Sequence, residues 1–177
     1  MALLALRLLT GEPAEMAALQ CVLEAAPRYF ETITGLPPGG AEAQSTFSAL
    51  PPGKTYDAKR VYGLYADDAM IGCADVIRGY PVAQKAVIGL LLLAEAWQRQ
   101  GIGRAFERLV VRTLADWPEI TTVRIGVVAT NASALTFWRK LGYRETGETR
   151  AAAPPFIADA IVLEKRLESE STSGVSP

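Results

Sequence analysis

Two glycines, Gly101 and Gly103, mark the stretch of this chain that is best suited to bind a phosphate. They follow an apolar run over residues 87–93, which predicts a buried strand. From Ile102 onward apolar residues recur at helical spacing, which predicts an amphipathic helix. A helix that begins in a glycine turn presents unpaired backbone N–H groups at its positive end, and a turn without side chains lets an anion approach them. The local chemistry is therefore that of a phosphate-binding loop.

This loop can be compared with known kinds of glycine loop. It is not of the G-x-x-x-x-G-K-[ST] type, because Arg104 follows the second glycine. It is a poor match to the dinucleotide pattern, since Phe106 stands where the third glycine belongs. It does fit the pattern Q/R-x-x-G-x-G/A, with Gln98 as its first residue. An ordinary strand–turn–helix connection that contains two glycines stays open as an alternative.

The composition limits the function classes. Of the 177 residues, 50% are hydrophobic and 21% are charged, as expected for one soluble globular domain. A formal net charge of −1 argues against a nucleic-acid or membrane-surface partner. No apolar run approaches the roughly 20 residues of a membrane helix. The first ten residues lack the basic start of a signal peptide, so a cytoplasmic location is expected.

The chain has no histidine, which excludes Ser-His-Asp and Cys-His catalysis and argues against a zinc site. Cys21 and Cys73 are far apart in the sequence, and both are expected to be small, buried apolar side chains. The chemistry must therefore come from carboxylates, tyrosines, backbone amides or a cofactor, and no metal is expected.

Hydrophobic periodicity and turn residues predict an alternation of strands and helices. Strands are expected over residues 3–9, 59–66, 70–77, 87–93, 122–129, 143–150 and 156–167. Helices are expected over residues 13–26, 41–50, 102–117 and 131–141, with a loop or a short broken helix over 27–40. This order predicts one α/β domain over residues 1–167, in which helices cover both faces of a central sheet. Residues 168–177 are polar and Ser-rich and are expected to form a flexible tail.

A second motif lies in the segment NASALTFWRKLGY, which begins at Asn131 and ends at Tyr143. It fits the pattern N-x-x-A-x-x-[LF]-Y-x-[KR]-x-G-[FY] except that Trp138 replaces the tyrosine. This segment and the glycine loop each follow a predicted strand, in this order, and together they resemble the GNAT superfamily of acyl-CoA N-acyltransferases. The resemblance covers about residues 3–167. It implies a mixed sheet of about seven strands flanked by about four helices, with two central parallel strands that splay apart.

The resemblance also implies a cofactor, acetyl-CoA, and a place for it. The pantetheine arm would pair with backbone groups of Leu91, Leu92 and Leu93, and the Leu93 N–H would polarise the thioester carbonyl. Asn131 would hydrogen-bond the pantetheine, and Trp138 would pack beside the thioester sulfur. The pyrophosphate would be wrapped by the loop residues Gln98, Arg99, Gln100, Gly101, Ile102, Gly103 and Arg104.

The implied reaction is acetyl transfer to a primary amine by direct attack in a ternary complex. The family tyrosine is commonly assigned as the acid that protonates the leaving thiolate, but the indole N–H of Trp138 has no usable acidity. Tyr143 and Tyr80 are candidate replacements, although a coenzyme A thiolate can also leave without an acid. Asp75 and Glu95 are the candidate general bases, and a water chain to bulk solvent is an alternative.

The acceptor is not named by the sequence. Tyr29, Phe30 and Tyr80 could form an aromatic cleft for a small-molecule or peptide amine, or they could be core residues. The alternatives to an N-acetyltransferase of this kind are a non-catalytic acyl-CoA-binding or regulatory domain and an aminoglycoside-modifying enzyme. Two copies of such a protein often pair through an edge strand, so a homodimer is one further expectation.

Overall fold

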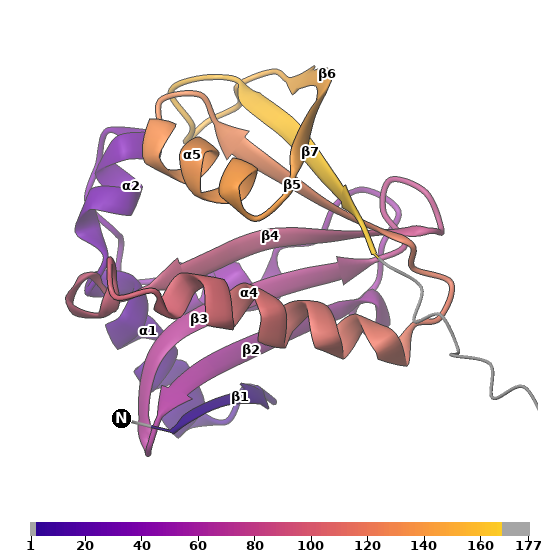
Figure 1. Ribbon diagram of the computed structural model, residues 1–177. Helices are drawn as coiled ribbons and strands as arrows, with labels where there is room; N and C mark the ends of the chain where they lie inside the picture. Colours follow the sequence, from indigo (N-terminus) through magenta and orange to yellow (C-terminus); the bar gives the residue numbers. More distant parts are fainter. Residues whose placement is uncertain (1–2, 168–177) are drawn as a thin grey trace, which may run out of the picture.

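The computed structural model describes residues 3–167, which form one seven-stranded sheet with helices on both faces (Figure 1). The strands are β1 (Leu4–Leu8), β2 (Lys59–Ala66), β3 (Ala69–Arg78), β4 (Lys85–Leu93), β5 (Thr122–Val128), β6 (Arg144–Arg150) and β7 (Ala160–Arg166). The helices are α1 (Pro13–Glu24), α2 (Pro27–Thr34), α3 (Glu42–Ser48), α4 (Ile102–Thr113) and α5 (Ala132–Lys140). The predicted α/β fold is confirmed, whereas the tail expected over 168–177 lies outside the described residues.

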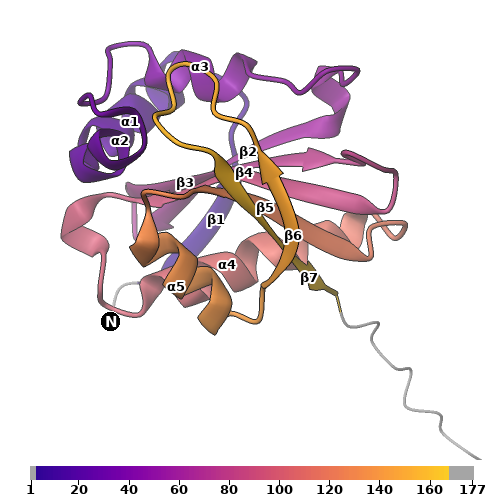
Figure 2. The same ribbon diagram turned by 90° about the horizontal axis from the view of Figure 1, so that it is seen from above.

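The strands follow the order β1-β2-β3-β4-β5-β7-β6. All neighbours are antiparallel except β4 and β5, which are parallel and are joined by a crossover through α4. Seen from above, α4 and α5 lie on one side of the sheet and α1, α2 and α3 on the other (Figure 2). Each layer closes its own hydrophobic core, as a sheet with two apolar faces requires.

The two cores differ in the helices that fill them. Phe106 and Val110 of α4 and Leu135 of α5 are buried in the larger core. Leu19 and Leu23 of α1 are buried in the smaller one, together with Cys73 of β3. The expectation that both cysteines are buried holds for Cys73 and is wrong for Cys21, which is exposed on α1.

Residues 27–34 form a regular helix, α2, where the sequence predicted a loop or a broken helix. Pro27 occupies the first turn of this helix and Gly35 ends it in the left-handed conformation, which are both ordinary helix signals. The helix start is completed by Glu95, whose carboxylate accepts the backbone N–H of Arg28 at 2.9 Å. That partner is remote in the sequence, so the local pattern alone underestimated the helix count. The last strand also begins later than expected, at Ala160 instead of residue 156.

Candidate functional site

A cleft of about 1120 Å³ opens between β4 and β5. The two strands pair from Lys85 and Thr122 as far as Ile88 and Ile125, and their pairing ends there. Beyond this point β4 continues beside β3 and β5 continues beside β7, so the two parallel strands diverge toward their carboxyl ends (Figure 1). The volume is slightly above the usual range for ligand sites, which is roughly 300–1,000 Å³.

Where β4 and β5 separate, the edge of β4 that faces β5 has backbone N–H and C=O groups without hydrogen-bond partners in β5. The Ala94 N–H donates to the Ile71 carbonyl of β3 at 2.9 Å, and hydrogen-bonding groups alternate between the two edges of a strand. The N–H groups of Leu91 and Leu93 therefore face the opening, whereas the backbone of Leu92 faces β3. The Leu93 carbonyl accepts a hydrogen bond from the side-chain N–H of Gln98 at 2.8 Å. The backbone N–H of Leu93 stays directed to the cleft.

The glycine loop forms one end of the cleft. Gly101 is the N-cap of α4 with φ of +79°, no side chain caps this helix, and nothing lies within 4 Å of the place a Cβ would take. Arg99 also has a positive φ, +61°, so this turn brings two left-handed residues close together. Of the loop residues named from the sequence, Gln98, Arg99, Gly101, Gly103 and Arg104 line the cleft and Gln100 and Ile102 do not.

Gly103 is a glycine for a reason that the sequence did not indicate. A Cβ at this position would lie 3.1 Å from the ring of Phe137 on α5. The missing side chain therefore lets α4 and α5 approach each other, which places the α5 residues beside the glycine-loop end of the cleft. Helix packing therefore favours glycine here, in addition to the expected approach of an anion.

Asn131 and Trp138 both line the cleft from α5. Asn131 caps the helix, as predicted: its side-chain oxygen accepts the N–H of Ala134 and the hydroxyl of Ser133, both at 3.1 Å, and its side-chain nitrogen has no partner among residues 3–167. The Trp138 ring is 7% exposed and packs edge-on against Phe137 and Tyr143. It forms an apolar part of the cleft wall.

Asp75 is the carboxylate that the fold brings to the cleft floor. Its Oδ1 oxygen binds Lys59 Nζ at 2.7 Å, and Oδ2 lies 3.0 Å from the place a Cβ would take at Gly89. Burial raises the pKa of the Asp75 carboxyl above its ordinary value, and the Lys59 ammonium only partly offsets this effect. A carboxylate with a raised pKa and one oxygen facing a cleft has the properties of a general base.

The two other catalytic candidates lie elsewhere. Glu95 caps α2 through Arg28, and it is not among the residues that line the cleft. Tyr143 is 2% exposed, and its hydroxyl donates to the buried carboxylate of Glu107 at 3.0 Å. Lys165 binds the same carboxylate at 3.0 Å, so Tyr143 belongs to a buried polar cluster on the α4 side of the sheet. Burial and the Glu107 charge raise the pKa of the Tyr143 hydroxyl well above its ordinary value.

Of the three aromatic residues expected to bind the acceptor, two line the cleft and one lies in the core. Tyr29 and Tyr80 line the cleft, whereas Phe30 is buried in the smaller core and meets Tyr29 edge to face. Burial raises the pKa of the Tyr29 hydroxyl, so this group stays protonated. The segment after β6, which includes Phe156, also lines the cleft.

Sequence reasoning missed two features of the cleft, Gly126 and Arg150. Gly126 follows the last residue of β5 that pairs with β4, and it is exposed in the opening. The Arg150 guanidinium lies above it, with Nη1 3.7 Å from the place a Cβ would take at Gly126. A glycine inside a strand is a known sign of close approach, and this signal was present in the sequence.

The site holds no metal cluster within the described range: no three acidic or cysteine side chains of residues 3–167 are grouped to bind an ion. In the same part of the chain, no helix is both long and apolar enough to cross a membrane.

Solved structures with a similar fold include several acetyltransferases. An acetyltransferase from Thermus thermophilus is 24% identical, with a TM-score of 0.72 over 94% of this chain and 100% of that chain. An aminoglycoside acetyltransferase in complex with coenzyme A is 21% identical, with a TM-score of 0.70 over 93% and 95%. A GNAT family acetyltransferase from Elizabethkingia anophelis with acetyl-CoA bound is 16% identical, with a TM-score of 0.63 over 93% and 98%. At these identities the likeness shows the fold.

The sequence itself supplies the family. A comparison with curated protein sequences found no match. The family model described as "Acetyltransferase (GNAT) family" matches residues 25–143, which is more than half of the chain and includes the parted strands, the glycine loop and the α5 motif. The chain therefore belongs to the acetyltransferase (GNAT) family and is an acetyl-CoA-dependent acyltransferase.

Proposed function

We propose that this protein transfers an acetyl group from acetyl-CoA to a primary amine by direct attack, with both substrates bound in the cleft. The observation that carries this proposal is the parting of β4 and β5 beside the uncapped start of α4. It creates one continuous cleft with a phosphate-binding end, a strand edge in the middle and an apolar end that contains a carboxylate.

The residues present fit coenzyme A. The first N–H groups of α4 have no side-chain cap and carry the positive end of the helix dipole, which suits a pyrophosphate. Arg99 and Arg104 are exposed at the same place, and neither makes an ion pair within residues 3–167. The amide-bearing pantetheine arm would bind the open edge at Leu91 and Leu93.

Three groups of this chain would then serve the transfer. Acetyl-CoA supplies an activated thioester carbonyl when it is bound. The Leu93 N–H would donate a hydrogen bond to the carbonyl oxygen as negative charge develops there. Asp75 Oδ2 would take a proton from the acceptor ammonium, which frees the nitrogen lone pair to form the new C–N bond. The nitrogen would lose its second proton to solvent as the C–S bond breaks. The bond electrons leave on sulfur, and the products are an acetamide and coenzyme A, with Trp138 as the apolar wall beside the sulfur.

The coenzyme A thiolate can leave without a general acid from the protein. Trp138 lines the cleft and offers an apolar surface without an acidic proton. Tyr143 is directed to Glu107, away from the cleft, so its hydroxyl does not support the role of acid. Since a coenzyme A thiol has a pKa of about 8.5, like that of a cysteine, the sulfur can leave as a thiolate and take its proton from solvent.

Calorimetric titration with acetyl-CoA tests the binding half of the proposal. The wild-type protein is expected to bind in the micromolar range, and Arg104→Gln is expected to weaken binding about 10-fold through loss of a charge-assisted hydrogen bond. The matched control is Arg108→Gln, which removes the same charge from an exposed position one turn further along α4, outside the cleft. Equal weakening by both variants would show that only overall charge matters and would contradict the loop assignment.

Thiol release in the presence of an amine panel tests the transfer half. Acetylated amine and free coenzyme A are expected in equal amounts. Binding of acetyl-CoA without transfer to any amine, across small primary amines and short peptides, would contradict the proposed reaction.

A further inference from the structure

The charged side chains that line the cleft are mostly basic. Its one lining carboxylate among residues 3–167 is that of Asp75, and Lys59 already neutralises this charge through a side chain that is 3% exposed. The basic side chains in the lining are Arg28, Arg99, Arg104, Lys140 and Arg150. Arg99 and Arg104 belong to the glycine-loop end, and Arg28 is partly neutralised by Glu95 at 3.5 Å. Lys140, in the last turn of α5, and Arg150 remain. Of these two, Arg150 is the cation that lies above Gly126, where β4 and β5 separate.

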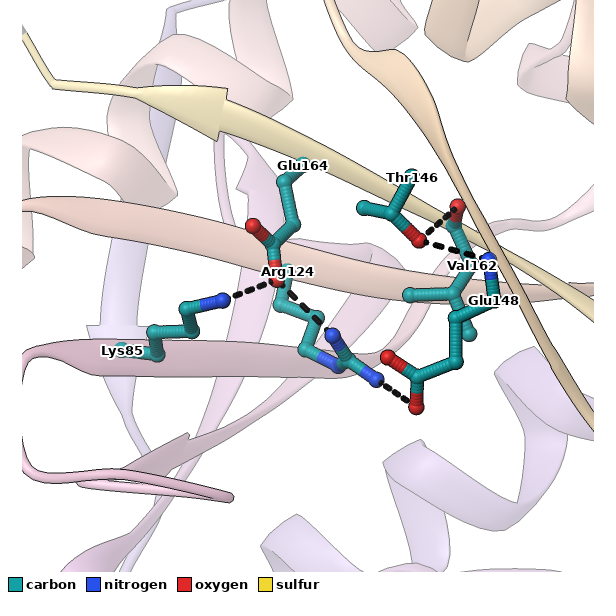
Figure 3. Close-up of polar contacts among 6 residues, drawn as sticks. All are labelled: Lys85, Arg124, Thr146, Glu148, Val162 and Glu164. Carbon is teal, nitrogen blue, oxygen red and sulfur yellow. Dashed lines mark hydrogen bonds and ion pairs between the residues drawn. The ribbon is translucent and has the colours of Figure 1, made fainter.

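Arg150 differs from the other arginine on this face of the sheet. Arg124 of β5 is almost buried and binds two carboxylates, those of Glu148 and Glu164, and Lys85 joins the same network (Figure 3). Arg150 has no carboxylate partner among the described residues. Its backbone position is defined, because β6 pairs Arg150 with Ala160 of β7, and its exposed side chain lines the cleft. A guanidinium that lines a cleft without a protein anion is available to an anion of the ligand.

The two glycines at the parting put Arg150 close to the proposed base. Gly89 and Gly126 directly follow Ile88 and Ile125, the last paired residues of the two strands. The Asp75 carboxylate lies above Gly89 and the Arg150 guanidinium lies above Gly126, and both side chains line the cleft. Paired strands are about 5 Å apart, and Gly89 and Gly126 are each one residue beyond the last pair, where the two strands begin to diverge. The gap between the carboxylate and the guanidinium therefore suits an acceptor of amino-acid size, with its amine at Asp75 and a second group at Arg150.

The remaining wall of this end is apolar. Tyr29 and Ile33 of α2, Ile77 of β3, Tyr80 and Phe156 line it. The segment that carries Phe156 is joined to α2 by a hydrogen bond from the Ile157 N–H to the Ile33 carbonyl, 3.0 Å long. These side chains suit an aliphatic or aromatic body and offer no second acidic group.

We propose that the acceptor is an amine that also carries a carboxylate, such as an α-amino acid with an apolar side chain, and that Arg150 binds the carboxylate. This inference rests on the proposed acetyl transfer and names its substrate class. The guanidinium and the carboxylate form a two-pronged hydrogen bond while the amine faces Asp75. A polycation such as an aminoglycoside is disfavoured, because it would meet Arg150 and Arg28 and find one carboxylate that is already paired.

Matched acceptor pairs test the proposal: leucine, methionine and phenylalanine, each beside its primary amide. Binding to the protein saturated with coenzyme A is measured by calorimetry, and acetylation by kcat/KM. At least one acid is expected to be preferred over its amide by roughly 10- to 100-fold, the range for a charge-assisted pair. The preference should be lost in Arg150→Gln and partly kept in Arg150→Lys. It should be unchanged in Arg144→Gln, an exposed arginine of the same strand outside this cleft.

The outcomes separate this inference from the transfer reaction. Amides that bind and react as well as the acids in all three pairs, or a preference that persists in Arg150→Gln, would overturn the carboxylate site and leave acetyl transfer standing. Arg150-dependent binding of the acids without any acetylation would support the carboxylate site and refute the proposed reaction. The α-amino group of an amino acid amide is less basic than that of the free acid, so a larger fraction of it is unprotonated and ready to attack. This difference favours the amides, so a higher kcat/KM for the acids would underestimate the effect of the carboxylate.

Discussion

The free carboxylate oxygen of Asp75 lies 3.0 Å from the point that a Cβ atom would occupy at Gly89, while Lys59 binds the other oxygen at 2.7 Å. One oxygen is therefore held by a buried ammonium, and the second faces the cleft because residue 89 has no side chain. This arrangement fixes the direction of the carboxylate and leaves it a single ligand position.

Asp75→Asn is expected to lower kcat/KM for acetyl transfer about 10²- to 10⁴-fold, the usual contribution of a general base. The amide keeps the shape and still accepts a hydrogen bond from Lys59, so acetyl-CoA affinity should not change. The base acts in its ionised form, and burial raises its pKa above the ordinary 3.8. The wild-type rate should therefore rise with pH through that raised pKa, and this acidic limb should vanish in the variant. A variant rate within threefold of wild type would exclude the role.

Glu95→Ala tests the other candidate base. The substitution removes the hydrogen bond between the Glu95 carboxylate and the Arg28 N–H and should lower the free energy of unfolding by about 1 kcal/mol, the usual value of a helix cap. The transfer rate per folded molecule should stay within threefold. A large loss of kcat at normal stability would return Glu95 to the set of catalytic groups.

Tyr143→Phe is expected to affect stability and not catalysis. The variant removes the hydroxyl that donates to Glu107, whose side chain is 1% exposed and retains Lys165 as a partner. A buried carboxylate that loses one hydrogen bond should cost about 1–3 kcal/mol of unfolding free energy, measured by urea denaturation. The kcat should change less than threefold. A drop of kcat beyond tenfold, with unfolding unchanged, would contradict this view.

The two glycines of the loop should respond differently to alanine. At Gly103 a new methyl would press on Phe137, at an expected cost of about 1–3 kcal/mol that outweighs the helix-propensity gain of about 1 kcal/mol. At Gly101 the space is open, but a φ of +79° costs an alanine about 1–2 kcal/mol. Phe137→Leu should relieve the first variant and leave the second unchanged. Urea denaturation of the double variants checks this, and equal coupling at both sites would contradict it.

Glu164 should make folding stability depend on pH. Burial opposes its ionisation, but hydrogen bonds from Lys85 and Arg124 outweigh burial and hold the pKa of this carboxyl below its ordinary 4.5. A carboxylate with a lowered pKa in the folded protein adds stability above the unfolded value, and this gain is lost as pH falls through the folded pKa. Glu164→Gln should therefore cost about 1–3 kcal/mol at pH 7 and progressively less below about pH 4.5.

The control for Glu164 is Glu145→Gln, which breaks an exposed pair with Arg139. Surface pairs contribute about 0–1 kcal/mol, so this variant should unfold close to wild type at every pH. A pH-independent cost at Glu164 would show that the loss is one of packing and not of charge.

The sequence by itself determined the parts of the site that depend on neighbouring residues. The turn at Gly101, the start of α4 and the Asn131 cap were all predicted, because a left-handed turn and an N-cap are made by groups within a few positions of each other. The element order was also sufficient for the fold class and, with the two motifs, for the family.

The tertiary structure alone decided which polar groups share the cleft. Asp75 and Arg150 come from strands that are remote in the sequence, and they face the opening because β4 and β5 separate after Ile88 and Ile125. Tyr143, a candidate acid in the sequence, turns toward Glu107, and Glu95, a candidate base, caps α2. Strand pairing and burial set these directions, and both depend on contacts between distant residues that no local pattern encodes.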